Sequence, residues 1–335
     1  MKVSISCLVY NHEPFIRQTI ESILAQKVNF DYEILIHDDA STDNSQNIIR
    51  EYTEKYPDII KPIYQTENQF SKGVDIGCKY NLPRAKGKYI ALCDGDDYWI
   101  DPYKLQKQVD FLDSHTDYAL CCHRALVKYE DSNRAPHRMP DDSIFTNNIS
   151  YELLLETNFI VTSSVMYRLD NRVISALTNE VPKDILPYDW YTYFLIVNGQ
   201  KIKLMEDVMS VYRINPQSIW SDFWEDREKV YLSPLGLKYA KFFYYHWNNI
   251  LNRDIKYKDM IMANIKPIFY SNLLHYNKET CEAMKEMFPE FDFYSATSDI
   301  PSKEYKREKK YQRLWVIFMI LSFVFAFVAL LELFI

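Results

Sequence analysis

Glycine is scarce in this sequence, with 6 among 335 residues. Neither the G-x-G-x-x-G fingerprint of dinucleotide-binding folds nor the G-x-x-x-x-G-K-[ST] phosphate loop occurs. The low glycine content also argues against a disordered chain. The commonest sequence signals of nucleotide binding are therefore missing.

Excess positive charge and zinc-binding spacings are missing as well. The formal net charge is −7, so no basic surface indicates a nucleic-acid partner. None of the 6 cysteines belongs to a C-x-x-C pair, and no histidine follows at the spacing of a zinc ligand. Most of them lie inside apolar, strand-like runs, which is typical of small buried residues in a reducing compartment.

The first part of the chain alternates between strand and helix patterns. Strands separated by helices in this way predict a Rossmann-like, mostly parallel sheet covered by helices. A further strand, a helix after Asp189, another strand-like stretch and an aromatic-rich helical region follow. The expected strands cover residues 3–9, 33–37, 60–65, 88–93, 160–168 and 202–213, and the helical region covers 222–300.

An acidic turn, Asp94-Gly95-Asp96-Asp97, follows the fourth of these strands. Three carboxylates in four residues would repel one another if left unpaired, and a hard divalent cation would relieve that repulsion. Gly95 would permit the tight turn that aims the flanking carboxylates at one point. The alternative is a solvated turn that caps the next helix. We expect Asp94, Asp96 and Asp97 to hold a metal ion.

A second acidic pair, Asp38-Asp39, follows the second strand. One carboxylate there can accept the N3–H of a uracil or thymine ring, and the other can cap the helix that starts near Asp43. In sheets of this class, ligands bind beyond the carboxyl ends of the strands. The two acidic clusters are therefore expected to converge on one crevice.

Four segments together resemble family 2 glycosyltransferases with a GT-A fold. They read VSISCLVYNHEPFIRQTIESILAQ, YEILIHDDASTDNS, AKGKYIALCDGDDYW and DPYKLQKQVDFL, and the resemblance covers residues 1–220. It implies that Asp39 binds the nucleotide base. The strand end at Leu8, Val9 and Tyr10 would form the nucleoside-binding edge. Asp94 and Asp96 match the family's Asp-x-Asp motif for metal and diphosphate, and Asp97 is the adjoining acid.

The resemblance also extends to two later segments, in which this sequence departs from the family. In PYDWYTYFLIVNGQKI, Asp189 matches the catalytic base, while Tyr188 replaces the usual glutamate. In YRINPQSIW, Arg213 would neutralise phosphate oxygens. Asn215 replaces a histidine that can complete the metal coordination, and its amide oxygen could still serve.

The C-terminal end carries a different signal. Residues 314–331 form an uncharged apolar run, and with the last residues up to 335 this stretch is long enough to cross a bilayer. The preceding segment 303–313 is basic, which by the positive-inside rule places it, and the domain before it, in the cytoplasm. The alternatives are a buried core helix or a hairpin in one leaflet. We expect a GT-A domain (1–220), a helical, acceptor- or membrane-proximal region (221–302), a basic segment (303–313) and one transmembrane helix (314–335).

These observations predict an inverting glycosyltransferase at the inner face of a bacterial plasma membrane. It would use Mg²⁺ or Mn²⁺ and a nucleotide-sugar donor, in the first place a UDP-sugar. The acceptor would be a hydroxyl of a glycan or of a lipid-linked molecule in cell-surface polysaccharide synthesis. A nucleotidyltransferase is an alternative, but YNHEPF stands where its Gly-rich loop would be. An inactive membrane-bound scaffold is another, although the acidic residues are intact. A processive synthase would need more than one membrane segment.

Overall fold

The computed structural model describes residues 1–130, 133–145, 149–215, 227–275, 277–291 and 293. The chain divides into a unit Met1–Met287 and a unit Phe288–Ile335. The expected boundary at residue 220 falls inside the range of the first unit. Among the described residues, no helix is long and apolar enough to span a bilayer. The basic segment 303–313 and the apolar segment 314–335 lie outside the described residues.

The first half of the sheet is parallel and has β1 near its centre. β1 pairs with β2 and β4, and β2 pairs with β3, in each case in parallel. The register joins Val9 to Asp38 and Asp38 to Tyr64, so the three strands end together. Alternate residues of β1, from Val3 to Val9, point into the same apolar core as α1, α2 and α3. The bounds are β1 Val3–Val9, α1 Ile16–Leu24, β2 Tyr32–Asp38, α2 Ser45–Lys55, β3 Ile60–Tyr64, β4 Tyr89–Leu92 and α3 Lys104–Ser114.

The second half of the sheet is mixed, which departs from the parallel pairing expected there, although parallel residue pairs still outnumber antiparallel ones in the whole sheet. The strand order is β3-β2-β1-β4-β8-β6-β9-β5, with β7 paired to β6. β8 lies antiparallel between β4 and β6, whereas β6 and β9 run parallel. The regular strand–helix alternation that predicts parallel pairing ends with β4. The bounds are β5 Tyr98–Trp99, β6 Tyr118–Tyr129, β7 His137–Met139, β8 Met166–Arg168 and β9 Lys201–Ile214.

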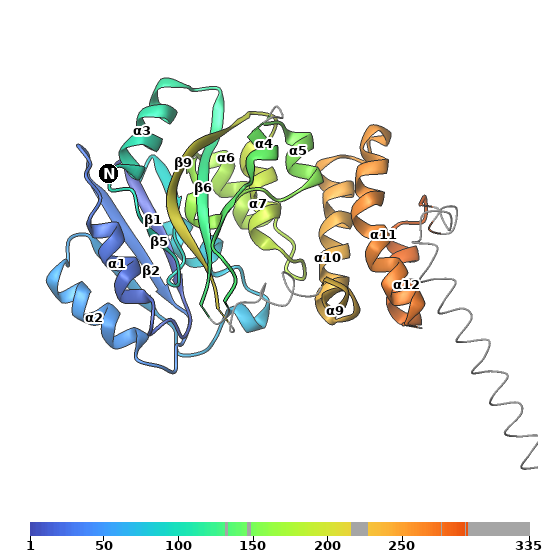
Figure 1. Ribbon diagram of the computed structural model, residues 1–335, viewed down its shortest axis with the longest axis horizontal. Coiled ribbons are helices and arrows are strands. Elements are labelled where there is room, and N and C mark those ends of the chain that lie inside the picture. The colour runs from blue at the N-terminus through green and yellow to red at the C-terminus, as the bar shows by residue number, and fades with distance from the viewer. Residues whose placement is uncertain (131–132, 146–148, 216–226, 276, 292, 294–335) are drawn as a thin grey trace, which may run out of the picture. The chain divides into compact units, whose positions relative to one another are not determined.

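The remaining elements are helical: α6 packs on α7, and α9, α10, α11 and α12 pack against one another, as Figure 1 shows. Every residue of α7 from Trp190 to Val197 is buried, so this helix has no solvent face. Its rings pack on α10, with 4.9 Å between the centroids of Trp190 and Phe242. The helices are α4 Asp142–Phe145, α5 Tyr151–Glu156, α6 Asn171–Asn179, α7 Tyr188–Val197, α9 Arg227–Leu232, α10 Pro234–Tyr245, α11 Lys258–Leu274 and α12 Lys278–Met287. Short helical turns are η1 Phe70–Lys72, η2 Gly77–Asn81, η3 Leu82–Arg84, η4 Thr162–Ser164, η5 His246–Ile250 and η6 Ile255–Tyr257.

Candidate active site

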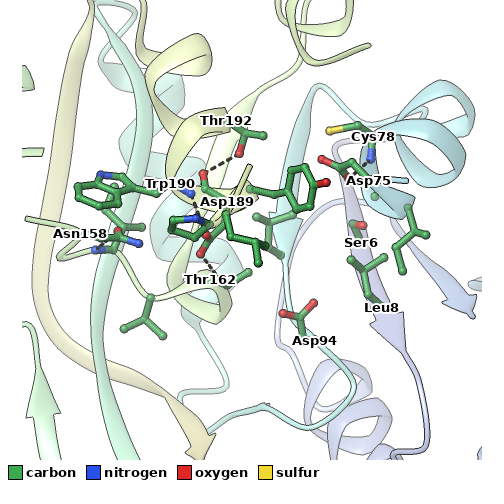
Figure 2. A pocket seen from close by; sticks show the side chains of 18 of the residues that line it. Ser6, Leu8, Asp75, Cys78, Asp94, Asn158, Thr162, Asp189, Trp190 and Thr192 are labelled. Atoms are coloured by element: carbon green, nitrogen blue, oxygen red, sulfur yellow. Dashed lines mark hydrogen bonds between the residues drawn. The ribbon is translucent and has the colours of Figure 1, made fainter. Parts of the chain in front are cut away.

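A cavity of about 960 Å³ lies beyond the carboxyl ends of the parallel strands. Figure 2 shows Leu8, Asp94, Asp75 and Asp189 arranged around it. The structure therefore brings together residues that are as far apart in the sequence as Leu8 and Asp189. The residues expected from the sequence that line the cavity are Leu8, Val9, Tyr10, Asp39, Asp94, Asp96, Asp189 and Asn215.

Asp39 is held in the cavity wall by the backbone that follows β3. The N–H of Gln69 donates to its Oδ1 at 2.8 Å and the N–H of Phe70 to its Oδ2 at 2.9 Å. Each carboxylate oxygen keeps a second lone pair for another donor. The neighbouring Asp38 is buried and accepts hydrogen bonds from Ser41 N–H at 3.0 Å and from the Gln46 side chain at 2.7 Å. Only Asp39 of this pair lines the cavity.

The strand end Leu8–Tyr10 lies beside Asp39 in the cavity wall. The Val9 carbonyl accepts a hydrogen bond from Asp39 N–H at 2.8 Å, and the Leu8 carbonyl accepts one from Gly95 N–H at 2.8 Å. Tyr10 is exposed over 44% of its surface, so its ring is open to a ligand. The end of β1 therefore ties both acidic clusters to one strand.

Asp94 and Asp96 both lie at the cavity, and both are half-buried. Burial, followed by the charges of Asp96 and Asp189, raises the pKa of Asp94 to about 8. Asp96 Oδ2 accepts a hydrogen bond from Asn215 Nδ2 at 3.1 Å. Among the described residues, no three His, Cys, Asp or Glu side chains are grouped closely enough to hold a metal ion. A Mg²⁺ or Mn²⁺ ion that shares phosphate oxygens with a substrate needs only one or two carboxylates, so this pair fits such an ion.

Asp97 and Arg213 do not line the cavity, in contrast to the expectation. Asp97 is buried and accepts a hydrogen bond from the backbone N–H of Arg213 at 2.9 Å. Burial and the charge of Asp96 hold the pKa of Asp97 well above its usual range. The Arg213 guanidinium donates to Glu130 Oε1 at 3.0 Å, to the Asp96 carbonyl and to Gln18. These contacts fasten the acidic turn to β9. Because both side chains are used in them, neither Asp97 nor Arg213 faces the cavity.

Asp189 lies in the first turn of α7. Its Oδ1 accepts a hydrogen bond from Trp190 N–H at 2.8 Å, and its Oδ2 accepts one from Thr162 Oγ1 at 3.2 Å. Burial raises the pKa of Asp189 above its usual value. A carboxylate that is oriented by two donors and has an increased proton affinity is suited to general-base chemistry.

Two further residues line the cavity, and one of them, Asp75, carried no recognisable signal in the sequence. Asp75, just before η2, accepts a hydrogen bond from Cys78 N–H at 2.9 Å and lines the cavity between the donor edge and α7. Tyr188, which replaces the family's glutamate, also lines it, and its ring contacts Phe70 edge-on with 6.3 Å between centroids. A lone aspartate in a polar loop has no diagnostic spacing, so only the fold identifies Asp75.

The fold is GT-A-like, and comparison with known proteins gives the family. Residues 4–171, half of the chain, match the model of Glycosyl transferase family 2. The chain belongs to this family.

Two relatives and one solved structure illustrate the similarity. An uncharacterized protein of Mycobacterium tuberculosis is 38% identical over 229 residues, which are 68% of this chain and 63% of that protein. This chain thus spans less than two thirds of that relative's length. The UDP-Glc:alpha-D-GlcNAc-diphosphoundecaprenol beta-1,3-glucosyltransferase WfaP of Escherichia coli is 28% identical over 274 residues, covering 77% of this chain and 97% of WfaP. The mannosyltransferase PcManGT of Pyrobaculum calidifontis, solved with GDP-Man and Mn²⁺, has a TM-score of 0.55 at 17% identity, covering 93% of this chain and 80% of that chain. The last likeness concerns the fold alone.

Proposed function

We propose that this chain is an inverting glycosyltransferase that transfers the sugar of a nucleoside-diphosphate sugar to a hydroxyl group. The observation that carries this proposal is the meeting of Asp39, Asp94, Asp96 and Asp189 around one cavity of about 960 Å³. Such a volume is typical of sites that enclose a small organic ligand. The carboxylates line different parts of its wall and can therefore take different roles.

The donor is a UDP-sugar in this proposal, and the transferred group is a hexosyl or N-acetylhexosaminyl residue. Asp39 is held as an acceptor by two backbone N–H groups and has spare lone pairs, which suits the N3–H of uracil. The name of the relative WfaP gives UDP-Glc as its donor. PcManGT was solved with GDP-Man, so guanine is the base to test against uracil.

Asp94 and Asp96 would hold the divalent metal, with the Asn215 side chain beside Asp96. The bound ion would offset the negative charge that builds up on the leaving nucleoside diphosphate. Arg213 and Asp97 support this arrangement by fixing the turn that presents Asp96.

Asp189 would act as the general base. It takes the proton of the acceptor hydroxyl while that oxygen attacks the anomeric carbon from the face opposite the diphosphate. A glycosidic C–O bond forms, the C–O bond to the diphosphate breaks, and the anomeric configuration inverts. Thr162 and the backbone N–H of Trp190 keep the carboxylate aimed during this step.

The acceptor would enter from the side of the helical region. Tyr231, Tyr239, Asn264 and Pro267, from α9, α10 and α11, line the same cavity as Asp189. Aromatic faces with an amide nearby suit a sugar ring. The name of WfaP describes a diphosphoundecaprenol-linked acceptor. We accordingly propose a glycan or lipid-linked acceptor in cell-surface polysaccharide synthesis, with segment 314–335 anchoring the enzyme so that its catalytic domain faces the cytoplasm.

Incubation of the full-length protein with a panel of nucleotide sugars and Mg²⁺ or Mn²⁺ tests this function. We expect hydrolysis or transfer with a UDP-sugar, and calorimetry should rank UDP above GDP and CMP. Asp189→Asn should lose turnover and keep nucleotide affinity, because the amide cannot accept the proton. Asp117→Asn, at an exposed ion pair with Lys201, is the matched control. A product of retained anomeric configuration would contradict the single displacement, and tightest binding of GDP would contradict the choice of base.

A further inference from the structure

His12 occupies a rigid position at the cavity that the roles assigned above leave unexplained. It follows β1, and the loop that carries it is fastened to the loop after β2. His12 N–H donates to Ser45 Oγ at 2.9 Å, and Glu13 N–H donates to Asp43 Oδ2 at 2.9 Å. Asn11 contributes two more bonds, from its N–H to Ser41 Oγ at 2.9 Å and from Thr42 N–H to its Oδ1 at 2.7 Å. The backbone under His12 is therefore preorganised.

The imidazole lies across the acidic turn. A Cβ added to Gly95 would come within 2.8 Å of His12 Nδ1, so the ring packs directly on this glycine. The other ring nitrogen, Nε2, is 3.9 Å from Asp96 Oδ2. That separation is too long for a hydrogen bond. His12 lines the cavity, so Nε2 is directed toward the space beside Asp96 where a ligand would bind.

The surroundings of the two nitrogens favour one tautomer. Nδ1 is buried and has no hydrogen-bond partner among the residues that the structure describes. A histidine that ligates a metal through Nε2 carries its proton on Nδ1 and normally donates it to an acceptor. The described part of the chain places no such acceptor at His12 Nδ1. A proton on Nε2 instead leaves Nδ1 with only an unused lone pair, and it makes Nε2–H a donor that faces the cavity.

We propose that His12 is a donor-binding residue whose Nε2–H donates a hydrogen bond to an oxygen of the nucleotide sugar's diphosphate, next to Asp96. This inference rests on the proposed function and deepens it. The chain itself would then contribute a hydrogen-bond donor to the leaving diphosphate, in addition to the metal ion. Asp96 and His12 divide the work, because a carboxylate can hold only the cation, whereas an imidazole N–H can hold the phosphate oxygen.

Two isosteric variants separate the nitrogens. In His12→Gln the amide NH₂ falls near the place of Nε2, whereas in His12→Asn it falls near the place of Nδ1. Dissociation constants for UDP and GDP, and for the nucleosides uridine and guanosine, would be measured with the full-length protein and Mg²⁺. Binding of Mn²⁺ alone would be followed by electron paramagnetic resonance, and thermal unfolding would check the fold of each variant.

We expect His12→Asn to weaken binding of the preferred nucleoside diphosphate by about 10- to 100-fold, the usual range for one hydrogen bond to a charged acceptor. Binding of the matching nucleoside should not change, and His12→Gln should retain most of the diphosphate affinity. In the wild-type protein, ¹⁵N-histidine spectra should show an Nε2-protonated ring whose Nε2 signal shifts when the diphosphate is added.

Wild-type diphosphate affinity in His12→Asn would overturn the inference and leave the proposed function standing. A loss of Mn²⁺ binding in both variants without nucleotide would make His12 a metal ligand and also overturn it. An Nδ1-protonated ring in the spectra of the wild-type protein would also overturn the inference, and this measurement does not depend on the folding of either variant. A wild-type protein that binds neither UDP nor GDP would refute the proposed donor class itself.

Discussion

Arg213 offers the clearest contrast between what family resemblance implies and what the structure shows. The resemblance implies that Arg213 is a phosphate ligand, and substitution of such a residue would change the stability of the fold little. The structure buries it between the rings of Tyr98 and Phe15, with its guanidinium carbon 4.3 and 5.0 Å from their centroids. Three protein oxygens, on Glu130, Gln18 and Asp96, accept its hydrogen bonds. We therefore expect Arg213→Met to act mainly on stability.

The size of that effect follows from the partners that remain. Met preserves the apolar stem and the backbone N–H that binds Asp97, so the loss is confined to the guanidinium. Breaking a buried charged pair by removing one partner costs about 3–5 kcal/mol. Glu130 is 23% exposed and can recover some hydration, so we expect the loss of stability to lie at the lower end of this range, at about 3 kcal/mol. For the unit Met1–Met287, with an unfolding entropy of about 2.1 cal/mol/K per residue, that corresponds to a decrease in Tm of about 5 °C.

Thermal and urea unfolding of Arg213→Met would be compared with Arg17→Met. Arg17 is paired with Glu51 at 2.8 Å on the surface of α1, and its loss should change stability little. Nucleotide affinity of Arg213→Met should fall only as far as the acidic turn loosens. An unchanged Tm together with a large loss of diphosphate affinity would refute this reasoning and restore the phosphate role.

Three further predictions concern the metal and the tail. Asp96→Ala should abolish metal-dependent transfer while the fold is kept, since this side chain is at the cavity surface; equal activity of mutant and parent in EDTA without added metal would contradict the metal role. The pKa of about 8 means that Asp94 is protonated at neutral pH in the metal-free protein, so Mn²⁺ binding should release a proton and strengthen as the pH rises to about 8, then level off. Calorimetry in two buffers of different ionisation enthalpy at pH 7 measures this release, and identical heats of binding would argue against it. Truncation after residue 302 should move the protein from membranes to the soluble fraction while donor hydrolysis persists; a truncated protein that stays on washed membranes would mean that another part of the chain binds lipid.

The placement of Asp39 and Asp94 at one cavity could be predicted from the sequence because its signals are local. Apolar strands followed at once by Asp39 and by Asp94 mark strand ends, and parallel strands bring their ends to one edge. The same reasoning failed for Asp97, because neighbouring residues in a turn point in different directions. Only the packing of β9 against the turn determines that Asp97 faces inward.

Long-range placement accounts for the other differences. The mixed second half of the sheet depends on which strand β8 joins, and its three residues carry too little pattern to decide this. Arg213 lies in a segment that the family resemblance marks, but its rotamer is decided by Glu130 and Gln18, which no spacing rule connects to it. Asp75 came to the cavity through a turn whose sequence has no diagnostic motif.

The seating of α10 on α7 has a consequence for building hybrid enzymes. Because α7 is buried on every side, a breakpoint at residue 220 would strip the aromatic rings of α10 from Trp190 and Phe194 and expose the helix that carries Asp189. A graft meant to exchange acceptor choice should instead transfer residues 188–287 as one cassette. The proposed general base would then travel with the helices that line its side of the cavity, and with β9, whose Arg213 contacts the acidic turn of the host. Chimeras joined before α7 should consequently fold and turn over, and those joined between α7 and α10 should aggregate.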